Sequence, residues 1–176
     1  TDSETLLAGG LVADNIEATV TDSYATGSVT ARDQAGGLIG SNNEGVVQQS
    51  YATGSATVTD YSGAIAGGLV GWNYLGTVTD SYATGAATAD PTGARAGGLV
   101  GYNQGSVERS YATGTTDAEY SGGVVGVNDS GTVDSSYWDT ESTGQSSSDG
   151  GTGLTTGQMQ GLEAQNNMSD LDFSTV

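Results

Sequence analysis

The sequence predicts an all-β protein: a β-solenoid (β-helix) of about five coils that ends in a small C-terminal cap. A start of two glycines and two aliphatic residues occurs five times in the 176 residues, at spacings of 27, 31, 30 and 25. A Ser-Tyr pair follows each start at a distance of 13 or 14 residues. Self-similarity with a period of roughly 20 to 50 residues is typical of stacked repeats, in which each unit buries its apolar stripe against its neighbours.

The two halves of the repeat differ in how much their length varies. From each Ser to the next pair of glycines the chain takes 13, 17, 16 or 12 residues, whereas the first half is nearly constant. β-branched residues and tyrosines occur in short runs that Gly and Asn interrupt, which favours short strands and tight turns over helix. The variable returns are therefore predicted to be loops on one side of the stack: about 30–35, 57–66, 88–96 and 115–121.

Each unit also carries one asparagine, four residues after its first aliphatic residue. The column consists of Asn15, Asn42, Asn73, Asn103 and Asn128. Side-chain amides stacked at the strand spacing of about 4.8 Å can hydrogen-bond from coil to coil. We therefore expect a structural ladder that holds the turns together, rather than a row that lines a binding groove.

A tyrosine column is compatible with two arrangements. Its members in the Ser-Tyr-Ala-Thr-Gly motif are Tyr24, Tyr51, Tyr82 and Tyr111. A valine four residues earlier would share the core face, but polar residues such as Asp22 and Arg109 stand between, so strict alternation fails. In one arrangement a corner turns the tyrosines inward, which we favour because exposed rings would form a large apolar patch. In the other, Ser, Ala and Gly face inward and the tyrosines are an outward binding surface.

The chain changes character after the fifth unit, so we divide it into a five-coil solenoid, 1–138, and a capping segment, 139–176. A polar loop is followed by apolar residues at helical spacing, which predicts one short helix with Thr155 or Thr156 as its N-cap. Leu171 and Phe173 are predicted to form a final strand-like plug, because an open solenoid end needs a cover. No comparable segment precedes the first coil, and we expect further coils before Thr1.

The charge balance excludes several classes of function. The chain has 21 acidic and 3 basic residues, a net charge of −18, and no cysteine, histidine or lysine. Nucleic-acid binding is not expected, because neutralising phosphates needs clustered Lys or Arg. Thiolate, imidazole and amine chemistry are also absent, as are the ligands of structural zinc. No apolar run is long enough for direct membrane insertion.

The acidic residues do not form a catalytic or metal-binding motif. Those in the returns, such as Asp33, Asp60, Asp90 and Asp117, are scattered as on a solvated face. We therefore expect no enzyme and no catalytic residues, the alternative being a carbohydrate-active β-helix lyase or hydrolase that uses carboxylates. No calcium-loop motif is present, so we expect no cofactor and no defined metal site, although weak, diffuse cation binding that includes calcium is compatible with the charge.

Two segments carry a family resemblance. Gly-Gly-Leu-Val-Gly-Trp-Asn (67–73) and Gly-Gly-Leu-Val-Gly-Tyr-Asn (97–103), each followed by Ser-Tyr-Ala-Thr-Gly, resemble the GLUG repeat of bacterial and archaeal surface proteins. That repeat occurs in adhesin-like proteins and, outside the catalytic part, in some immunoglobulin A peptidases. The resemblance implies an extracellular, cell-surface location and transfers no catalytic residue. The acidic, lysine-free composition is similar to that of haloarchaeal proteins, the alternative being an ordinary acidic secreted protein.

These observations predict a structural or adhesive repeat module whose variable loops contact a partner. The partner would be a surface glycan or protein of another cell, or neighbouring modules of the same polypeptide. Aromatic residues in or beside variable positions are the candidate binding residues: Trp72, Tyr74, Tyr102, Tyr61 and Tyr120.

Overall fold

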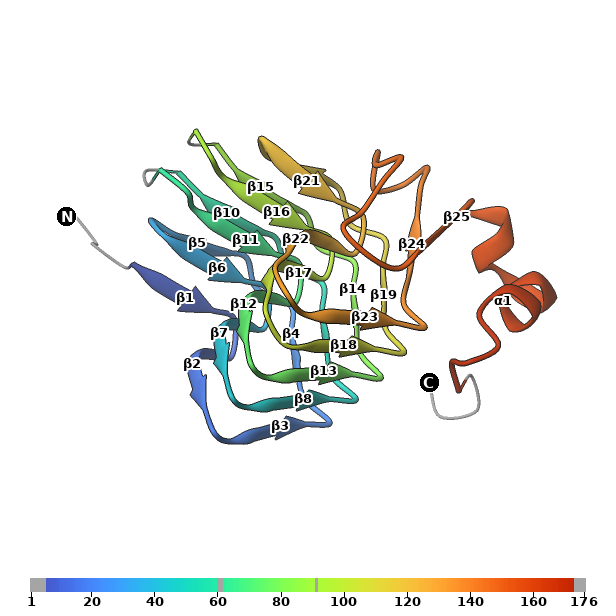
Figure 1. Cartoon of the computed structure of the whole chain (residues 1–176), viewed down its shortest axis with the longest axis horizontal. Coiled ribbons are helices and arrows are strands. Elements are labelled where there is room, and N and C mark those ends of the chain that lie inside the picture. Colours follow the sequence, from blue (N-terminus) through green and yellow to red (C-terminus); the bar gives the residue numbers. More distant parts are fainter. Residues whose placement is uncertain (1–5, 60–61, 91, 173–176) are drawn as a thin grey trace.

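The computed structural model describes residues 6–59, 62–90 and 92–172, and these form five stacked coils of short parallel strands (Figure 1). The first coil contains β1 (Leu7–Gly9), β2 (Val12–Ile16), β3 (Thr19–Thr21), β4 (Tyr24–Ala25) and β5 (Val29–Ala31). The second contains β6 (Gln34–Gly36), β7 (Ile39–Asn43), β8 (Val46–Gln48), β9 (Tyr51–Ala52) and β10 (Ala56–Val58). The third contains β11 (Ile65–Gly67), β12 (Val70–Tyr74), β13 (Thr77–Thr79), β14 (Tyr82–Ala83) and β15 (Ala87–Ala89).

The last two coils follow the same order before the chain enters the cap. The fourth contains β16 (Arg95–Gly97), β17 (Val100–Asn103), β18 (Ser106–Glu108), β19 (Tyr111–Ala112) and β20 (Thr116–Asp117). The fifth contains β21 (Tyr120–Gly122), β22 (Val125–Asn128), β23 (Thr132–Asp134) and β24 (Tyr137–Asp139). The cap adds β25 (Thr152–Leu154), the 3-10 helix η1 (Gly157–Met159) and α1 (Gly161–Asn167).

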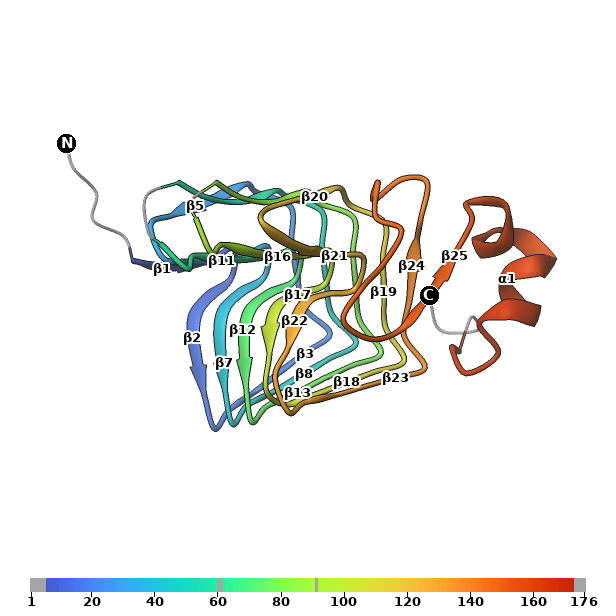
Figure 2. The same ribbon diagram turned by 45° about the horizontal axis from the view of Figure 1, so that its top comes forward.

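Corresponding strands of successive coils pair in parallel and form the five sides of the solenoid (Figure 2). In the order in which the chain visits them, we number these sheets one to five. Sheet one is β1-β6-β11-β16-β21, sheet two β2-β7-β12-β17-β22, sheet three β3-β8-β13-β18-β23, sheet four β4-β9-β14-β19-β24-β25, and sheet five β5-β10-β15-β20. The predicted all-β solenoid of about five coils is confirmed.

Aliphatic side chains fill the interior in columns, one from each coil. Leu38, Leu69 and Leu99 are fully buried, and stacked valines and the alanines of sheet four pack against them. A second cluster, rich in alanine, lies between sheets one and five. A single coil has too little apolar surface to fold alone, so the stacking of equivalent residues creates a continuous core.

The asparagines form a buried hydrogen-bonded ladder along sheet two. The Nδ2 atom of each of Asn15, Asn42, Asn73 and Asn103 donates to the Oδ1 atom of the next member, at 2.8 Å in every step. The amide of Asn42 also donates to the backbone oxygen of Gly45 at 3.0 Å. Gly45 must be glycine, because a Cβ atom there would lie 2.3 Å from the Nδ2 atom of Asn15.

A left-handed corner between sheets three and four decides which way the tyrosines face. The residue before each Ser-Tyr pair has a positive φ of 43° to 50°, and the column consists of Asp22, Gln49, Asp80, Arg109 and Ser135. The following serine fixes this corner: the hydroxyl of Ser50 donates to the backbone oxygen of Gln48 at 2.8 Å and accepts the N–H of Ser23 at 3.2 Å. The corner breaks the alternation expected of a continuous strand.

The tyrosines of the first four coils face outward, so the inward arrangement favoured from the sequence is wrong. The alanine after each tyrosine enters the core instead, as Ala52 and Ala83 show by being fully buried. Tyr24 is 60% exposed, and only Tyr137 of the fifth coil is buried, at 7%. The patch argument failed because the rings stack on one another and so cover each other's faces.

Trp138 closes the C-terminal end of the core. It takes the place that alanine has in the other coils, in register with Ala112, and joins the main hydrophobic cluster. A Cβ atom on Gly123 would lie 2.1 Å from the Trp138 ring, so the glycine makes room for the indole. The loop that follows covers the last strands: the Ser148 hydroxyl accepts the N–H groups of Val124 and Val125 at 3.0 and 2.9 Å.

The helical part of the cap lies beside sheet four, next to β25 (Figure 1). Helix is present in two short pieces, η1 and α1, where the sequence predicted one; α1 begins after Gln160 and not at Thr155 or Thr156. Thr155 and Gln158 form a capping box, in which the Gln158 N–H reaches the Thr155 hydroxyl at 3.3 Å and the Thr155 N–H reaches Gln158 Oε1 at 2.9 Å. Leu171 packs against the cluster of Leu154, Ala164 and Met168 through a turn and not through a strand. Phe173 lies outside the described residues.

Candidate functional site on the outer faces

Three of the predicted binding residues come together on the outer face of sheet two. The ring centroids of Trp72 and Tyr74 are 5.6 Å apart in an edge-on arrangement, and those of Trp72 and Tyr102 are 6.1 Å apart. The guanidinium of Arg95, on sheet one, lies 4.8 Å from the Tyr102 ring centroid. We call Trp72, Tyr74, Arg95 and Tyr102 the aromatic cluster.

Polar side chains of the next coils hold the rim of the aromatic cluster. Trp72 Nε1 donates to Gln104 Oε1 at 3.1 Å, and Gln104 Nε2 donates to Asp129 Oδ2 at 3.0 Å. The Tyr102 hydroxyl donates to the same Asp129 oxygen at 2.8 Å. This hydrogen bond raises the pKa of Tyr102 and lowers that of Asp129, so the carboxylate stays ionised and the phenol protonated near neutral pH.

The other two predicted aromatic residues do not join this cluster. Tyr120 is 51% exposed on β21, paired with Arg95 of the neighbouring strand. None of the ring contacts within the described part of the chain includes Tyr120. Tyr61 lies outside the described residues.

A second outward feature is the stacked tyrosine ladder on sheet four. Successive rings of Tyr24, Tyr51, Tyr82 and Tyr111 have centroid separations of 5.2, 4.9 and 5.0 Å and interplanar angles of 7° or less. The parallel register of β4, β9, β14 and β19 imposes this spacing, because equivalent residues lie one strand apart. Stacking leaves the edges and hydroxyl groups of the rings as the outward surface.

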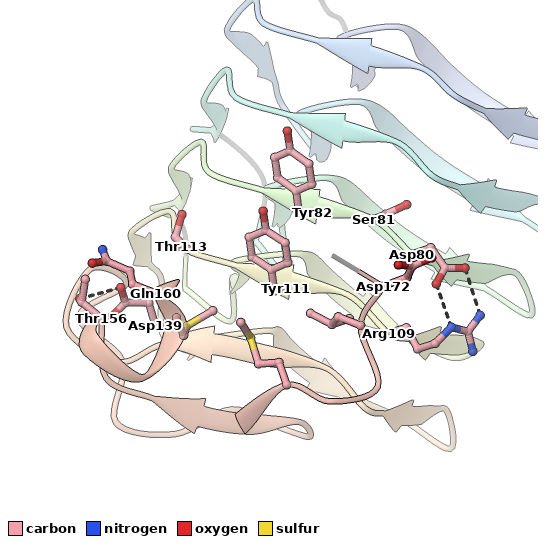
Figure 3. Close-up of a pocket in the computed structure, with 13 residues that line it drawn as sticks. Asp80, Ser81, Tyr82, Arg109, Tyr111, Thr113, Asp139, Thr156, Gln160 and Asp172 are labelled. Atoms are coloured by element: carbon pink, nitrogen blue, oxygen red, sulfur yellow. Dashed lines mark hydrogen bonds and ion pairs between the residues drawn. The ribbon is translucent and has the colours of Figure 1, made fainter. Parts of the chain in front are cut away.

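The tyrosine ladder ends in a pocket of about 240 Å³ between sheet four and the cap (Figure 3). We call it the cap pocket. Its apolar lining comes from two ladder tyrosines and three residues of the cap: Tyr82, Tyr111, Met159, Met168 and Leu171. Its polar lining comes from the corners, sheet four and the cap: Asp80, Ser81, Arg109, Thr113, Asp139, Thr156, Gln160 and Asp172.

The charged groups of the cap pocket are held by specific partners. Arg109 Nε donates to Asp80 Oδ1 at 2.8 Å, and its Nη1 donates to Glu108 Oε2 at 3.1 Å. The hydrogen bond from Arg109 lowers the pKa of Asp80. Partial burial raises the pKa of Asp139, but hydrogen bonds from the Thr156 hydroxyl and the backbone N–H groups of Ser142 and Glu141 outweigh it, and the net shift is downward. Both carboxyl groups are therefore ionised near neutral pH.

Burial also raises the pKa of the tyrosines at this end of the ladder, Tyr82 and Tyr111. It raises the pKa of Tyr111 to about 12, with a further contribution from Tyr82. The sequence indicated the tyrosine column, but it contained no sign of the cap pocket, because no local signal brings residues near 80 and 110 against residues 156–172.

Within the described ranges, no group of three or more His, Cys, Asp or Glu side chains could hold a metal ion. None of the described helices is long and apolar enough to cross a membrane.

Comparison with known proteins agrees with the repeat architecture. Residues 62–88 and 92–116 match the family described as the GLUG motif. The third and fourth coils carry GLUG motifs. These GLUG segments include Trp72, Arg95 and Tyr102, so most of the aromatic cluster is built on them.

A relative and a solved structure extend the GLUG similarity. An 81-residue stretch is 41% identical to a protein of Evansella cellulosilytica that is named as a Gly-rich membrane protein, and covers 42% of this chain and 9% of that protein. A crystal structure described as that of an immunoglobulin A1 protease from Bacteroides ovatus aligns over 92% of this chain and 59% of its own, with a TM-score of 0.68 and 19% identity. The second likeness shows a common fold. This chain spans less than two thirds of either protein.

Proposed function

We propose that this chain is a non-catalytic structural and adhesive module of a cell-surface or secreted protein, and that its aromatic cluster contacts a surface glycan. The observation that carries the proposal is the outward grouping of Trp72, Tyr74 and Tyr102 beside hydrogen-bonding groups of Gln104 and Asp129. A sugar ring offers an apolar face and a rim of hydroxyl groups, and apolar surface with a few placed polar groups suits it.

The scaffold supports this proposal because it holds the cluster on strands and not on mobile segments. Trp72 and Asn73 are neighbours on β12, and Asn73 is a fully buried member of the asparagine ladder. A site whose side chains are carried by such strands is preorganised, which reduces the entropy lost on binding. The name of the Evansella relative and the GLUG motifs support a surface location.

A catalytic role is not proposed, because the carboxylates nearest the aromatic and tyrosine surfaces are already engaged. Asp80 is paired with Arg109, Asp129 accepts from Tyr102, and Asp139 accepts from Thr156. A carbohydrate-active enzyme would need two carboxyl groups facing one another across a substrate. Incubation of each bound glycan with the chain tests this point, since release of shorter products would establish catalysis.

Binding of the chain to a glycan array tests the proposed contact between the aromatic cluster and a surface glycan. We expect one or more glycans to bind, and Trp72→Ala to weaken binding at least tenfold, as expected for an aromatic anchor. Tyr24→Ala is the matched control, because it removes an exposed ring on a different sheet. Equal loss in both variants, or retention of full binding by Trp72→Ala with native circular dichroism, would overturn the proposed site.

We also propose that the acidic surface suits concentrated salt. A net charge of −18 repels itself at low ionic strength. Screening becomes effective over about 3 Å near 1 M salt. The melting temperature is therefore expected to rise between about 0.1 M and 2 M sodium chloride, and a flat or falling curve would favour an ordinary acidic secreted protein.

A further inference from the structure

The cap pocket has an apolar wall and an acidic rim. Its wall joins the rings of Tyr82 and Tyr111 to the thioethers of Met159 and Met168, with Leu171 from the turn after α1. Figure 3 shows Tyr82 and Tyr111 on sheet four, with Thr156 and Gln160 of the cap beside the same pocket. Both methionines belong to the cap segment and line the pocket from that side. Methionine side chains are flexible and polarizable, so the thioethers can adapt to alkyl chains of varied shape.

The charges around the pocket are predominantly negative. Asp80, Asp139 and Asp172 line it, and Arg109 is its one lining cation among the described residues. Asp80 and Glu108 both contact the Arg109 guanidinium, at 2.8 and 3.1 Å, so two carboxylates offset its single charge. The chain as a whole carries −18. An anionic ligand would therefore be repelled both by the rim and by the surrounding surface.

An alkyl chain that ends in a cation is complementary to both properties. Basic side chains place their methylene groups along apolar surface while the charged end stays near water or carboxylates. The edges of Tyr82 and Tyr111 and the two thioethers would contact the methylene groups, and the carboxylates of the rim would face the charge. A cation close to tyrosine rings also gains electrostatic attraction when it reaches a ring face.

We propose that the cap pocket binds a basic side chain, lysine or arginine, of a partner protein, with its alkyl stem against Tyr111, Met159 and Met168 and its charge toward the acidic rim. This site lies on sheet four and the cap, whereas the aromatic cluster lies on sheets one and two. The two sites are separate, and failure of one in the tests leaves the other standing. The downward pKa shifts of Asp80 and Asp139 keep the rim ionised near neutral pH, which supports the proposal.

The methionines give the site a direct probe. The chain has only two methionines, and both line the cap pocket. We would label their methyl groups with carbon-13 and titrate the full chain with three blocked pentapeptides, Gly-Gly-X-Gly-Gly, in which X is lysine, arginine or norleucine. The expected result is a saturable shift of both methyl signals with lysine or arginine, at dissociation constants in the millimolar range (~1–10 mM) for one side chain.

Norleucine separates the proposed site from a merely apolar pocket, because it keeps the alkyl stem and lacks the charge. We expect it to bind at least fivefold more weakly at low salt, and the difference to shrink as salt is added. Equal shifts with norleucine, or no shift with any of the three peptides, would overturn the proposal.

A matched pair of variants then tests the acidic rim. Asp80→Asn removes a rim charge at a corner with φ of 50°, and Asp22→Asn makes the same change at the equivalent corner of the first coil, with φ of 49°. Asparagine tolerates this left-handed conformation, so both variants are expected to fold. Asp80→Asn should weaken the lysine peptide at least threefold and leave norleucine unchanged, whereas Asp22→Asn should change neither. Equal weakening in the two variants would show nonspecific attraction to the acidic surface and would overturn the proposal.

Discussion

The asparagine ladder and the tyrosine ladder are two columns of the same repeat that lie on opposite sides of the solenoid wall. Both place one residue per coil at the strand spacing; the asparagine ladder runs through all five coils and the tyrosine ladder through the first four. The amides of the asparagine ladder face inward, and their donors and acceptors are taken up by one another and by backbone oxygens. The tyrosines face outward with their ring faces covered by one another, and the cap covers Tyr111 in addition.

This difference separates holding the fold together from meeting a partner. A buried amide that loses its partner leaves an unsatisfied polar group, which makes the inner column intolerant of change. An exposed ring that loses its neighbour is solvated, and the rest of the coil is little affected. Recurrence in the sequence thus marks both columns equally, and the side of the sheet decides what each one does.

Breaking the asparagine ladder is expected to have the largest effect. Asn73→Ala removes the acceptor of Asn42 Nδ2 and the donor to Asn103 Oδ1, both at 2.8 Å and buried. The free energy of unfolding, measured by urea denaturation, should fall by about 2–4 kcal/mol, because buried polar groups lose their partners. Asn43→Ala is the control, because Asn43 directly follows Asn42 on β7 and so faces away from the ladder. This change should cost less than about 0.5 kcal/mol. Similar losses in both variants would contradict the structural role of the ladder.

Breaking the tyrosine ladder should cost less. Tyr82 stacks on both Tyr51 and Tyr111, so Tyr82→Ala removes two ring contacts. Aromatic pairs contribute about 0.5–1.5 kcal/mol each, and partial exposure reduces this, so we expect a loss of about 1–2 kcal/mol in the same urea experiment. Tyr24→Ala removes one contact at the exposed end and should cost about half as much. A loss for Tyr82→Ala as large as that for Asn73→Ala would erase the distinction between the two columns.

Alkaline pH should weaken the buried end of the tyrosine ladder, where burial raises the pKa of both Tyr82 and Tyr111. Burial raises the pKa of Tyr111 from 10.0 to about 12. The unfolded chain therefore loses this proton at lower pH than the folded chain, and the stabilisation is complete below about pH 10 and declines between pH 10 and 12. Urea midpoints across this range should fall, and Tyr111→Phe should flatten part of the decline. A midpoint that falls equally in wild type and Tyr111→Phe would assign the effect to other groups.

Much of the fold could be predicted because the repeat is visible in the chain itself. The number of coils, the buried aliphatic stripe and the asparagine column all follow from equal offsets between the repeats. They also follow from chemistry, because aliphatic side chains belong in the core and stacked amides pair with one another. The position of Val70, for example, is aliphatic in every coil and that of Asn73 is always asparagine, and both residues are fully buried.

The orientation of the tyrosines could not be predicted in the same way. It depends on a left-handed corner occupied by Asp, Gln, Arg or Ser, and these residues share no local preference for a positive φ. The closure of the core by Trp138 was also hidden, because in the sequence this residue simply follows one more Ser-Tyr pair. The cap pocket depends on contacts between Tyr111 and residues near Met168, and no periodicity in the chain encodes such a contact.

Side-chain hydrogen exchange compares the two faces most directly. Nitrogen-15 spectra would follow the Nδ2 protons of Asn42 and Asn73. The side-chain amide of Asn43, which lies on β7 beside Asn42, is the internal reference. Closed hydrogen bonds predict that the ladder amides exchange only through opening of the solenoid, at rates that change with its unfolding free energy, whereas the Asn43 amide exchanges as freely as in an unfolded chain. Ladder amides that exchange as fast as that of Asn43 would contradict the claim that the inner column holds the coils together.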